Sequence, residues 1–465
     1  MRSMKKVVWC LLLVLGVTVQ TGQVHADVDF QELGSALDKV SLGMEIHTLY
    51  RYDKDPYYGS ADFIPGGETD TGFGEIWATI RLTAEKDFGW AEASGQFAPV
   101  YTQTIDQDVY GLSKDDGGLD VDQAWIKFGQ IKNSPFDFTI GRQDIQLGNW
   151  MVIADGSGQE QANWLQFQES FPFAVRLDGN FGALSSTLYW ARSENYYQKF
   201  EETALFGPVD DVEVAGLQGQ YNFNETNFVF AGVHRKIDDG NRQTTDNFFL
   251  SPNGTEVWSA QNNTTAWDLG AQVAVGNLLL EGEAVYQNGD AGELAGQSRD
   301  RDAFGGFASV TYNIPVDYAP WIRGSYFYFS GEDDPGDDEA SDYDPMFSGF
   351  KGWNRFVIGE IAGELHLPNS NKKTAVAEVG FSPADAVFVS LVYLNHKLDE
   401  NYWLFVPTSS DDWADEVNLL IDAPLNENLF AHTGFGWSRP GDAAEEIFGD
   451  DQDAYFAQLW LSYSF

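Results

Sequence analysis

Short and long connections alternate along the whole chain, between segments in which polar and apolar residues alternate with the period of a β-strand. Most of these segments are close to the roughly ten residues that a tilted strand needs to cross a bilayer. The eighteen predicted strands span residues 40–51, 74–87, 90–101, 121–130, 135–145, 173–181, 184–192, 212–222, 227–235, 265–275, 278–287, 302–312, 319–329, 373–381, 387–397, 415–423, 428–437 and 455–465.

The connections constrain the fold further than the strands do. The short ones are rich in Gly, Asn, Asp and Pro, which favour tight hairpin turns, and they include 87–90, 131–134, 182–183, 222–226, 276–277, 313–317, 382–386 and 424–427. The long ones include 52–72, 102–120, 146–172, 236–264, 330–372, 398–414 and 438–454. A soluble sandwich has no need of this strict alternation, whereas outer-membrane barrels have short periplasmic turns and longer outer loops. The sequence therefore predicts an all-β fold, a single transmembrane antiparallel β-barrel of about 18 strands with long acidic extracellular loops.

The two ends of the chain indicate export to the outer membrane of a Gram-negative bacterium. Basic residues followed by an apolar run at 7–19 and a small-residue site at 24–26 predict a signal peptide of residues 1–26 that is cleaved on export. Residues 27–38 then form a periplasmic lead-in, and residues 39–465 form the barrel. At the other end Tyr463 and Phe465 lie on the apolar face of the last strand. This aromatic end resembles the signal that the outer-membrane assembly machinery reads.

The composition excludes several classes of function. The only cysteine, Cys10, falls within the predicted signal peptide, so the mature chain has no disulfide, thiol catalysis or covalent haem. With 27 basic and 71 acidic side chains the net charge is −44, which repels nucleic acid. The acidic runs at 332–344 and 445–453 are either solvated loops or sites for divalent cations, and neither has the spacing of an EF-hand. We therefore predict no resident metal site and no cofactor.

Strand alternation predicts which side chains face the lumen. In the second strand Ile80 and Leu82 lie on the apolar face, whereas Glu75, Trp77 and Arg81 lie on the other. The same reasoning places further polar residues inside, namely Glu45, Glu92, Lys127, Arg176, Asp178, Asp268, Glu281, Glu283, Arg323, Glu378, Asn418 and Asp422. Residues 212–222 and 227–235 have no clear alternation.

These inward charges allow two interpretations. They can pair with one another and fill the interior, because a charge on the lipid face costs several kcal/mol. Alternatively, the basic residues form cationic stations among carboxylates along a conducting path, where rings of charge set ion selectivity. The stations would be Arg81, Lys127, Arg176 and Arg323, and the carboxylates Asp178, Glu281, Glu283 and Glu378.

One stretch resembles a known family. Residues 123–129, 138–148 and 173–178 resemble the alginate-export porin family, in which a strand ending in Gly-Arg-Gln precedes a loop and a strand with an inward arginine. The resemblance implies an eighteen-stranded outer-membrane barrel that passes an anionic polysaccharide through an arginine-lined lumen. The resemblance would make Gly141, Arg142 and Gln143 the equivalents of the family's Gly-Arg-Gln motif, and Arg176 the equivalent of its inward arginine. Strict alternation puts Arg142 on the lipid face, so a bulge at Gly141 would be needed to turn it inward. The chain departs from the family in having few basic residues.

The leading hypothesis for function is a porin that gives small hydrophilic solutes or ions passive passage, with possible saccharide selectivity. The alternatives are a scaffold or sheath around a partner such as an electron-transfer protein, and an alginate-like polysaccharide export pore. No Gly-x-Ser-x-Gly, His-Glu-x-x-His or phosphate-binding glycine loop occurs, so we predict that the chain is not an enzyme. The expected partners are outer-membrane lipids and lipopolysaccharide, the assembly machinery, and the solute or ion itself.

The connection at 330–372 is the best candidate for a loop that folds into the lumen. It contains apolar residues at 346–350 and Trp353 beside its acidic run. The alternative is a large surface loop.

Overall fold

The computed structural model describes residues 37–60, 69–109, 117–131, 134–154, 156, 164–165, 170–193, 212–237, 258–259, 263–294, 297–334, 337–349, 359, 361–367, 369–403 and 406–465. The predicted signal peptide lies outside these residues, as does all of the predicted lead-in except residues 37 and 38. Within the described part of the chain, no helix is long and apolar enough to cross a membrane.

Eighteen long antiparallel strands form one continuous sheet, which confirms the predicted fold class and strand number. The strands are β1 (Lys39–Lys54), β2 (Asp70–Asp87), β3 (Glu92–Ile105), β4 (Gly117–Gly129), β5 (Phe136–Gln143), β6 (Phe171–Phe181), β7 (Leu184–Ser193), β8 (Val212–Asn222), β9 (Phe228–Ile237), β11 (Asn263–Val275), β12 (Leu278–Leu294), β13 (Gln297–Asn313), β14 (Trp321–Phe329), β16 (Lys372–Ala384), β17 (Val387–Leu398), β20 (Asp412–Pro424), β21 (Leu429–Pro440) and β22 (Ala454–Ser464).

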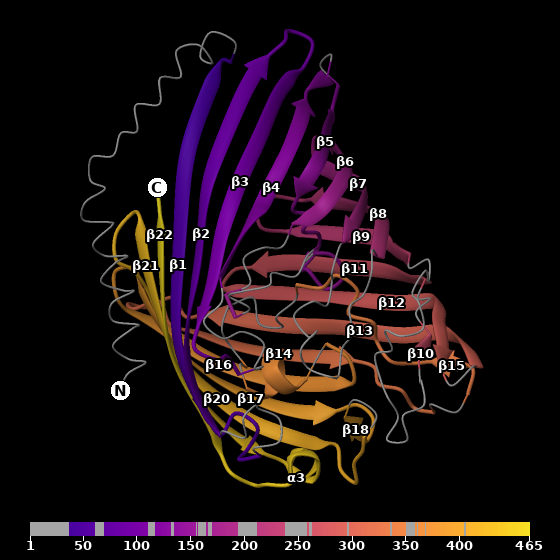
Figure 1. Ribbon diagram of the computed structural model, residues 1–465, viewed down its shortest axis with the longest axis vertical. Helices are drawn as coiled ribbons and strands as arrows, with labels where there is room; N and C mark the ends of the chain where they lie inside the picture. Colours follow the sequence, from indigo (N-terminus) through magenta and orange to yellow (C-terminus); the bar gives the residue numbers. More distant parts are fainter. Residues whose placement is uncertain are drawn as a thin grey trace.

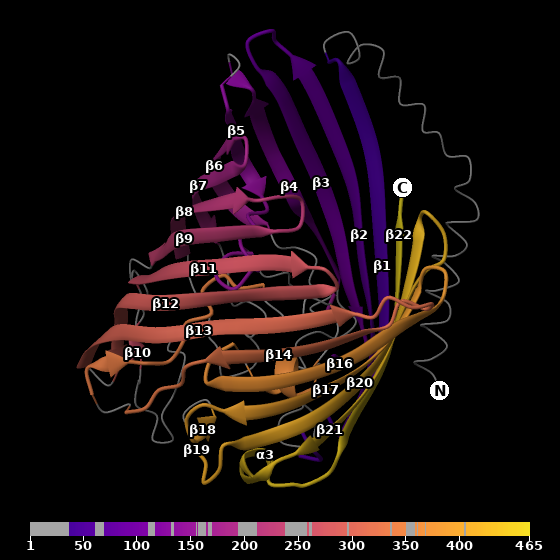
Figure 2. The same ribbon diagram turned by 180° about the vertical axis from the view of Figure 1, so that it is seen from behind.

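The sheet closes on itself because its first strand pairs with its last. β1 pairs with β2 on one side and with β22 on the other, from Glu45 opposite Ser464 to Lys54 opposite Tyr455. Figures 1 and 2 show β21, β22, β1 and β2 side by side along this seam. Closure leaves no sheet edge with unpaired backbone groups, which is the condition for a sheet in lipid.

The wall has two faces of opposite character. Ile80, Leu82 and Ile126 project outward with 49%, 37% and 52% of their surface exposed, whereas Glu75 and Trp77 on the opposite face are each 1% exposed. Exposure of so much apolar surface to water is energetically unfavourable, so the outer face suits lipid.

Short turns join the strands at one end, and long connections join them at the other. The β6–β7 turn consists of Gly182 and Ala183 alone, and Gly182 has a φ of 74°, a left-handed value that glycine adopts without strain. The long connections carry the remaining short elements, which are β10 (Trp258–Ser259), β15 (Glu339–Ala340), β18 (Tyr402–Trp403), β19 (Val406–Pro407), the π-helix η3 (Ala362–His366) and the α-helix α3 (Asp442–Phe448).

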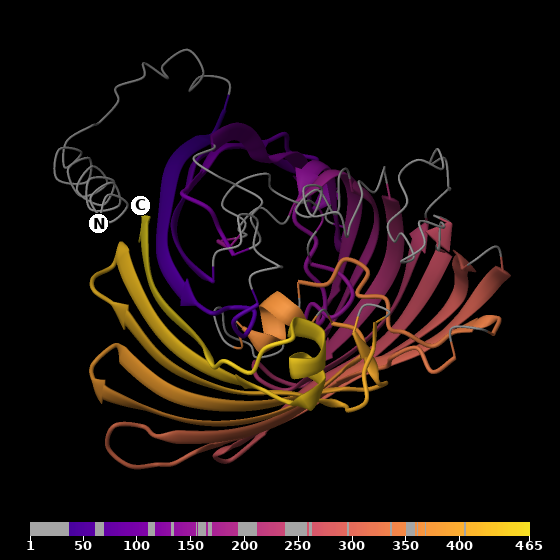
Figure 3. The ribbon, with the colours of Figure 1, turned by 60° about the horizontal axis from the view of Figure 1, so that its bottom comes forward.

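The largest hydrophobic core lies inside the barrel. It joins inward side chains of the wall to parts of two connections. We call the described residues of these connections the first infolded loop (144–154, 156, 164–165 and 170, between β5 and β6) and the second infolded loop (330–334, 337–349, 359, 361–367 and 369–371, between β14 and β16). Figure 3 shows coloured parts of both loops within the ring of strands. Met346 and Phe347 of the second infolded loop are completely buried there. This part of the connection therefore folds into the barrel and is not a surface loop. Trp353 lies outside the described residues.

Candidate functional site

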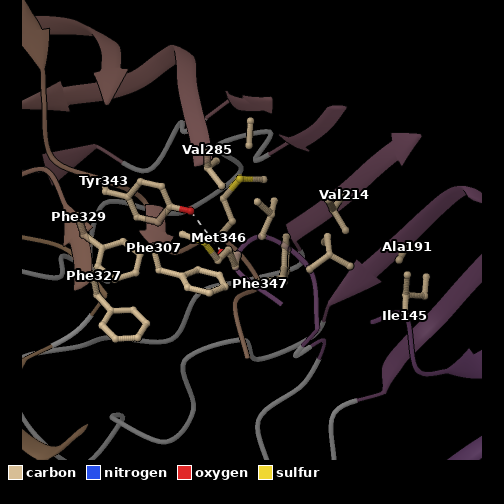
Figure 4. Packing of buried hydrophobic residues seen from close by; sticks show 14 of the residues in the cluster. Ile145, Ala191, Val214, Val285, Phe307, Phe327, Phe329, Tyr343, Met346 and Phe347 are labelled. Carbon is tan, nitrogen blue, oxygen red and sulfur yellow. Dashed lines mark hydrogen bonds between the residues drawn. The ribbon is translucent and has the colours of Figure 1, made fainter. Parts of the chain in front are cut away.

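The two infolded loops meet each other inside the barrel. Ile153 and Phe347 form an isolated parallel β-bridge, in which the backbone N–H of Ala154 donates to the Phe347 carbonyl at 2.8 Å and the Phe347 N–H donates to the Val152 carbonyl at 3.1 Å. Figure 4 shows Met346 and Phe347 beside Tyr343 and the wall residue Phe307. The loops therefore form one packed layer across part of the lumen.

A buried ion pair and an amide hold the second infolded loop against the wall. Asp344 lies 2.8 Å from the ammonium group of Lys236 on β9, with side-chain exposures of 5% and 8%. Gln287 on β12 accepts the Asp344 backbone N–H at 2.8 Å and donates to the Asp344 carbonyl at 2.6 Å. Burial alone would raise the pKa of Asp344, but the charges of Lys236 and Arg301 outweigh burial and hold that pKa well below its usual value.

Two buried carboxyl groups of the wall bind amide groups of the first infolded loop. Glu75 on β2 accepts the N–H groups of Trp164 and Leu165 at 3.0 and 2.8 Å. Glu283 on β12 accepts the N–H and the side-chain amide of Asn149 at 2.8 and 3.0 Å. Each of these carboxyl groups accepts two hydrogen bonds from the first infolded loop, so both contribute to its position.

A third carboxylate acts on η3 in the same way. Glu416 on β20, which is completely buried, accepts the N–H groups of Ile361 and Ala362 at 3.3 and 2.8 Å. Asn418, two residues along the same strand, accepts the N–H of Gly359 at 2.6 Å. The inward face of β20 thus binds the C-terminal part of the second infolded loop.

The predicted cationic stations are each paired with a carboxylate. Arg81 lies 2.9 Å from Glu45, Lys127 lies 2.8 Å from Asp137, and Arg176 lies 2.9 Å from Asp178. The basic side chains of these three pairs retain 36%, 38% and 32% exposure, so water reaches them.

The fourth pair differs because it is shielded from water. Arg323 on β14 lies 2.8 Å from Glu378 on β16, and the two side chains are 9% and 1% exposed. Glu281 is only partly buried, whereas Glu283 is buried and accepts hydrogen bonds from the first infolded loop. Whether any of these residues sets selectivity remains a prediction.

Arg142 lies at a strand irregularity. The β5–β6 register shifts between Gly141 and Gln143, and Gly141 has a φ of 123°. The Arg142 side chain is 17% exposed; its Nε donates to the Asp122 carbonyl at 3.2 Å and its guanidinium lies 3.7 Å from Asp120. The side chain is thus largely covered by β4.

Three charged residues that help to position the infolded loops were not predicted from the sequence, namely Arg51 and Asp53 on β1 and Lys236 on β9. Arg51 and Asp53 form a completely buried pair at 2.6 Å, and the Arg51 guanidinium lies 3.9 Å from the ring centroid of Trp164 in the first infolded loop. Lys236 has an equivalent role for the second loop. All three sit next to a long connection, and that position is the only signal the sequence offers.

The C-terminal residues continue the seam. Phe465 and Met44 exchange backbone hydrogen bonds of 3.1 Å each, and the Phe465 side chain is 57% exposed. Among the described residues, no three His, Cys, Asp or Glu side chains are grouped as metal ligands would be.

Comparison with known proteins rests on the fold alone. No family model matches the chain, and no curated protein matches its sequence. Solved structures of Occ and Opd porins do match it. OccAB4 of Acinetobacter baumannii has a TM-score of 0.55 at 10% identity, and OccK9 (OpdG) of Pseudomonas aeruginosa has 0.56 at 11%; each match covers 92% of this chain and 98% of the other. OccK2 (OpdF) of P. aeruginosa, solved in complex with glucuronate, has 0.53 at 12% with the same coverage.

These matches correct the family prediction. The fold neighbours are Occ and Opd porins and not alginate-export porins, so the assignment from the Gly141-Arg142-Gln143 motif is wrong. The physical reason is that the motif forms a local strand bulge, a feature that barrels of many families contain. The prediction of an eighteen-stranded barrel did not depend on the motif and stands.

Proposed function

We propose that this chain is an outer-membrane porin that gives small hydrophilic solutes or ions a passive route along their gradient. The observation that carries the proposal is that the described parts of two long connections are bound inside a closed barrel, next to a wall that carries water-accessible charged pairs. Loops that narrow a barrel of this size convert a wide channel into one that can discriminate among solutes. The shared fold with Occ and Opd porins supports the same class of function.

The charge arrangement favours small solutes over polyanions. Arg81, Lys127 and Arg176 each lie beside a carboxylate, so the accessible pairs are close to neutral. The chain as a whole has a net charge of −44, which disfavours an anionic polymer near its loops. OccK2, one of the fold neighbours, was solved in complex with glucuronate, so small sugars and sugar acids are the first solutes to test.

The proposal includes the route to the membrane. Residues 1–26 would act as a cleaved signal peptide, and Tyr463 and Phe465 would engage the assembly machinery. The outer face would contact lipid and lipopolysaccharide, and divalent cations would bind at the acidic outer loops. Catalysis has no supporting observation.

Planar-bilayer recording of the purified, refolded protein tests the central claim. We expect discrete conductance steps and a reduction in current when a permeant solute is added. A refolded barrel that gives no conductance above that of the bare bilayer would overturn the proposal. The sheath alternative requires a partner protein inside the barrel, where parts of both infolded loops already lie; a stoichiometric partner that co-purifies with the barrel and occupies the lumen would support it instead.

A further inference from the structure

The barrel seam carries a group of aromatic side chains on its lumen face. Trp460 on β22 lies 5.4 Å from Phe430 on β21 in an edge-to-face arrangement and 5.8 Å from His47 on β1, measured between ring centroids. The His432 ring lies 6.2 Å from Trp460. Two of the strands, β21 and β22, are consecutive in the chain, and β1 lies beside β22 because the barrel closes.

The orientation of these rings follows from the strand register. Trp460 is paired with Leu49 across β1, and His47 and Leu49 share a face with Glu45 and the completely buried Arg51. On β22 the neighbouring Leu459 is exposed to the outside, so Trp460 points inward. Trp460 and Phe430 are both only partly buried, so part of each ring surface is open to the lumen.

Charged groups of both signs border the aromatic group. His47 lies 4.0 Å from Glu45, which in turn pairs with Arg81 at 2.9 Å. On the other side His432 lies 2.6 Å from Asp422. The surface therefore offers flat apolar rings together with hydrogen-bond donors and acceptors, and the Arg81 and Glu45 charges offset each other.

The position of the group connects it to the infolded layer. Trp460 packs against the hydrophobic cluster that contains Trp164 and Leu165 of the first infolded loop. A solute held on Trp460 would thus lie next to the segment that narrows the lumen.

We propose that the lumen face of the seam is a binding subsite for a neutral pyranose sugar, a proposal that rests on the porin function above. A pyranose has one face of C–H groups that packs on an aromatic ring by dispersion and by loss of water contact. Its hydroxyl groups both donate and accept, so they can bond to Arg81 and Glu45 together. A simple anion would meet the carboxylates of Glu45 and Asp422, and a purely apolar solute would leave the charged groups without water.

Solute block of single-channel current tests the subsite. Glucose is compared with sorbitol, a linear polyol of similar size that lacks the ring face. In the unaltered protein we expect glucose to block at a concentration about tenfold lower than sorbitol, the difference that one good aromatic contact provides. Glucuronate is the anionic comparison, and we expect it to block more weakly than glucose.

Two substitutions separate ring stacking from packing. Trp460→Leu keeps apolar volume against the first infolded loop but removes the flat face, and we expect it to abolish the preference for glucose. Trp460→Phe should retain most of the preference. The matched control is Trp125→Leu on β4, a partly buried lumen tryptophan that hydrogen-bonds to Gln123 at 3.0 Å and lies outside the seam; the glucose preference should survive in this variant.

The outcomes distinguish the two proposals. Normal conductance with equal block by glucose and sorbitol would overturn the subsite and leave the porin function intact, as would equal loss of preference in the Trp460→Leu and Trp125→Leu variants. Stronger block by glucuronate than by glucose would also overturn it, because the subsite would then be anion-selective. Absence of conductance would overturn the porin function and, with it, the subsite.

Discussion

Ion pairs inside this barrel differ chiefly in how far water reaches them. The Arg176–Asp178 pair is open to the lumen, with side-chain exposures of 32% and 17%, whereas Arg323 and Glu378 are shielded by their surroundings. Exposed pairs contribute little to stability and act mainly on the local potential, whereas loss of one partner in a buried pair is strongly destabilising. We therefore expect Arg176 to act on ion selectivity and Arg323 to act on stability.

Arg176→Gln should change selectivity without loss of the fold. Removal of this cation leaves the Asp178 carboxylate in the lumen, so the cation-to-anion permeability ratio should rise on the order of twofold. Reversal potentials in a salt gradient measure this ratio. An unchanged ratio, with correctly folded protein, would argue against a conducting path past Arg176.

Arg323→Gln should instead act on stability. Glu378 would lose its ion-pair partner at a position that is 1% exposed, and we expect a loss of about 3 kcal/mol in the free energy of unfolding. Urea unfolding in detergent provides the measurement. The double variant Arg323→Met with Glu378→Leu removes both charges and should recover most of the loss; failure to recover would mean that the pair has a further role.

At the scale of elements, the second infolded loop depends on charged groups at each end of its path. Asp344 meets Lys236 near one end, and Glu416 receives the amides of η3 near the other. Next to Asp344 the loop packs through Tyr343, Met346 and Phe347. These contacts come from β9, β12 and β20, so the loop links distant parts of the wall.

Acidification should release the Asp344 end of the loop. Since the folded-state pKa of Asp344 lies below the usual carboxyl value, its pairing stabilises the docked loop above that usual value and is lost as pH falls toward the lowered pKa. We expect larger current fluctuations below about pH 4 in single-channel records. Asp344→Asn should already show them at neutral pH, and a variant as quiet as the unaltered protein would contradict the role of this pair.

His366 predicts a second pH effect in a different range. Its Nε2 lies 2.7 Å from the Pro56 carbonyl, its ring packs on Tyr58 and Phe448, and burial lowers its pKa to about 3. The His366 ring is therefore neutral in the folded state, whereas in the unfolded state it becomes protonated below about pH 6.5. The free energy of unfolding should therefore fall as pH decreases from about 6.5 toward 3.

Thermal unfolding measured between pH 7 and pH 5 tests the His366 effect in a range where Asp344 remains charged. His366→Phe should reduce the slope of melting temperature against pH. An identical slope in the variant would show that other groups control stability in this range.

For the whole molecule, closure of the barrel depends on pairing between its first and last strands. β1 and β22 pair over ten residues, and Phe465 extends the ladder through Met44. The seam strands also carry the aromatic group proposed to bind a sugar. Closure thus serves both membrane stability and the assembly of that surface.

Phe465→Ser should impair insertion rather than conduction. The phenyl ring lies on the outer face, 6.3 Å from the Tyr463 ring between centroids, where it is available to the assembly machinery and to lipid. Membrane fractionation and heat-modifiable migration on gels would measure folded protein, and we expect a reduction of severalfold. Protein that inserts at the normal level would refute the assembly role of this residue.

Much of the wall could be predicted from local pattern. All eighteen strands were recognised, because outward residues such as Ile80 and Leu82 alternate with inward residues such as Glu75 and Arg81. The exceptions are informative. β8 and β9 have no clear alternation since their inward faces include Val214 and Phe230, which are buried inside the barrel.

The sequence by itself determined the strand number and the barrel class, because these follow from a period of two and from connection length. Only the tertiary structure decided what the charged side chains of the strands contact. It assigned Glu283 and Glu75 to loop amides, paired Arg323 with Glu378, and brought Trp460 and His47 together at the seam. The physical reason is that alternation is a local property, whereas ion pairing, loop docking and closure depend on strands that are distant in the chain.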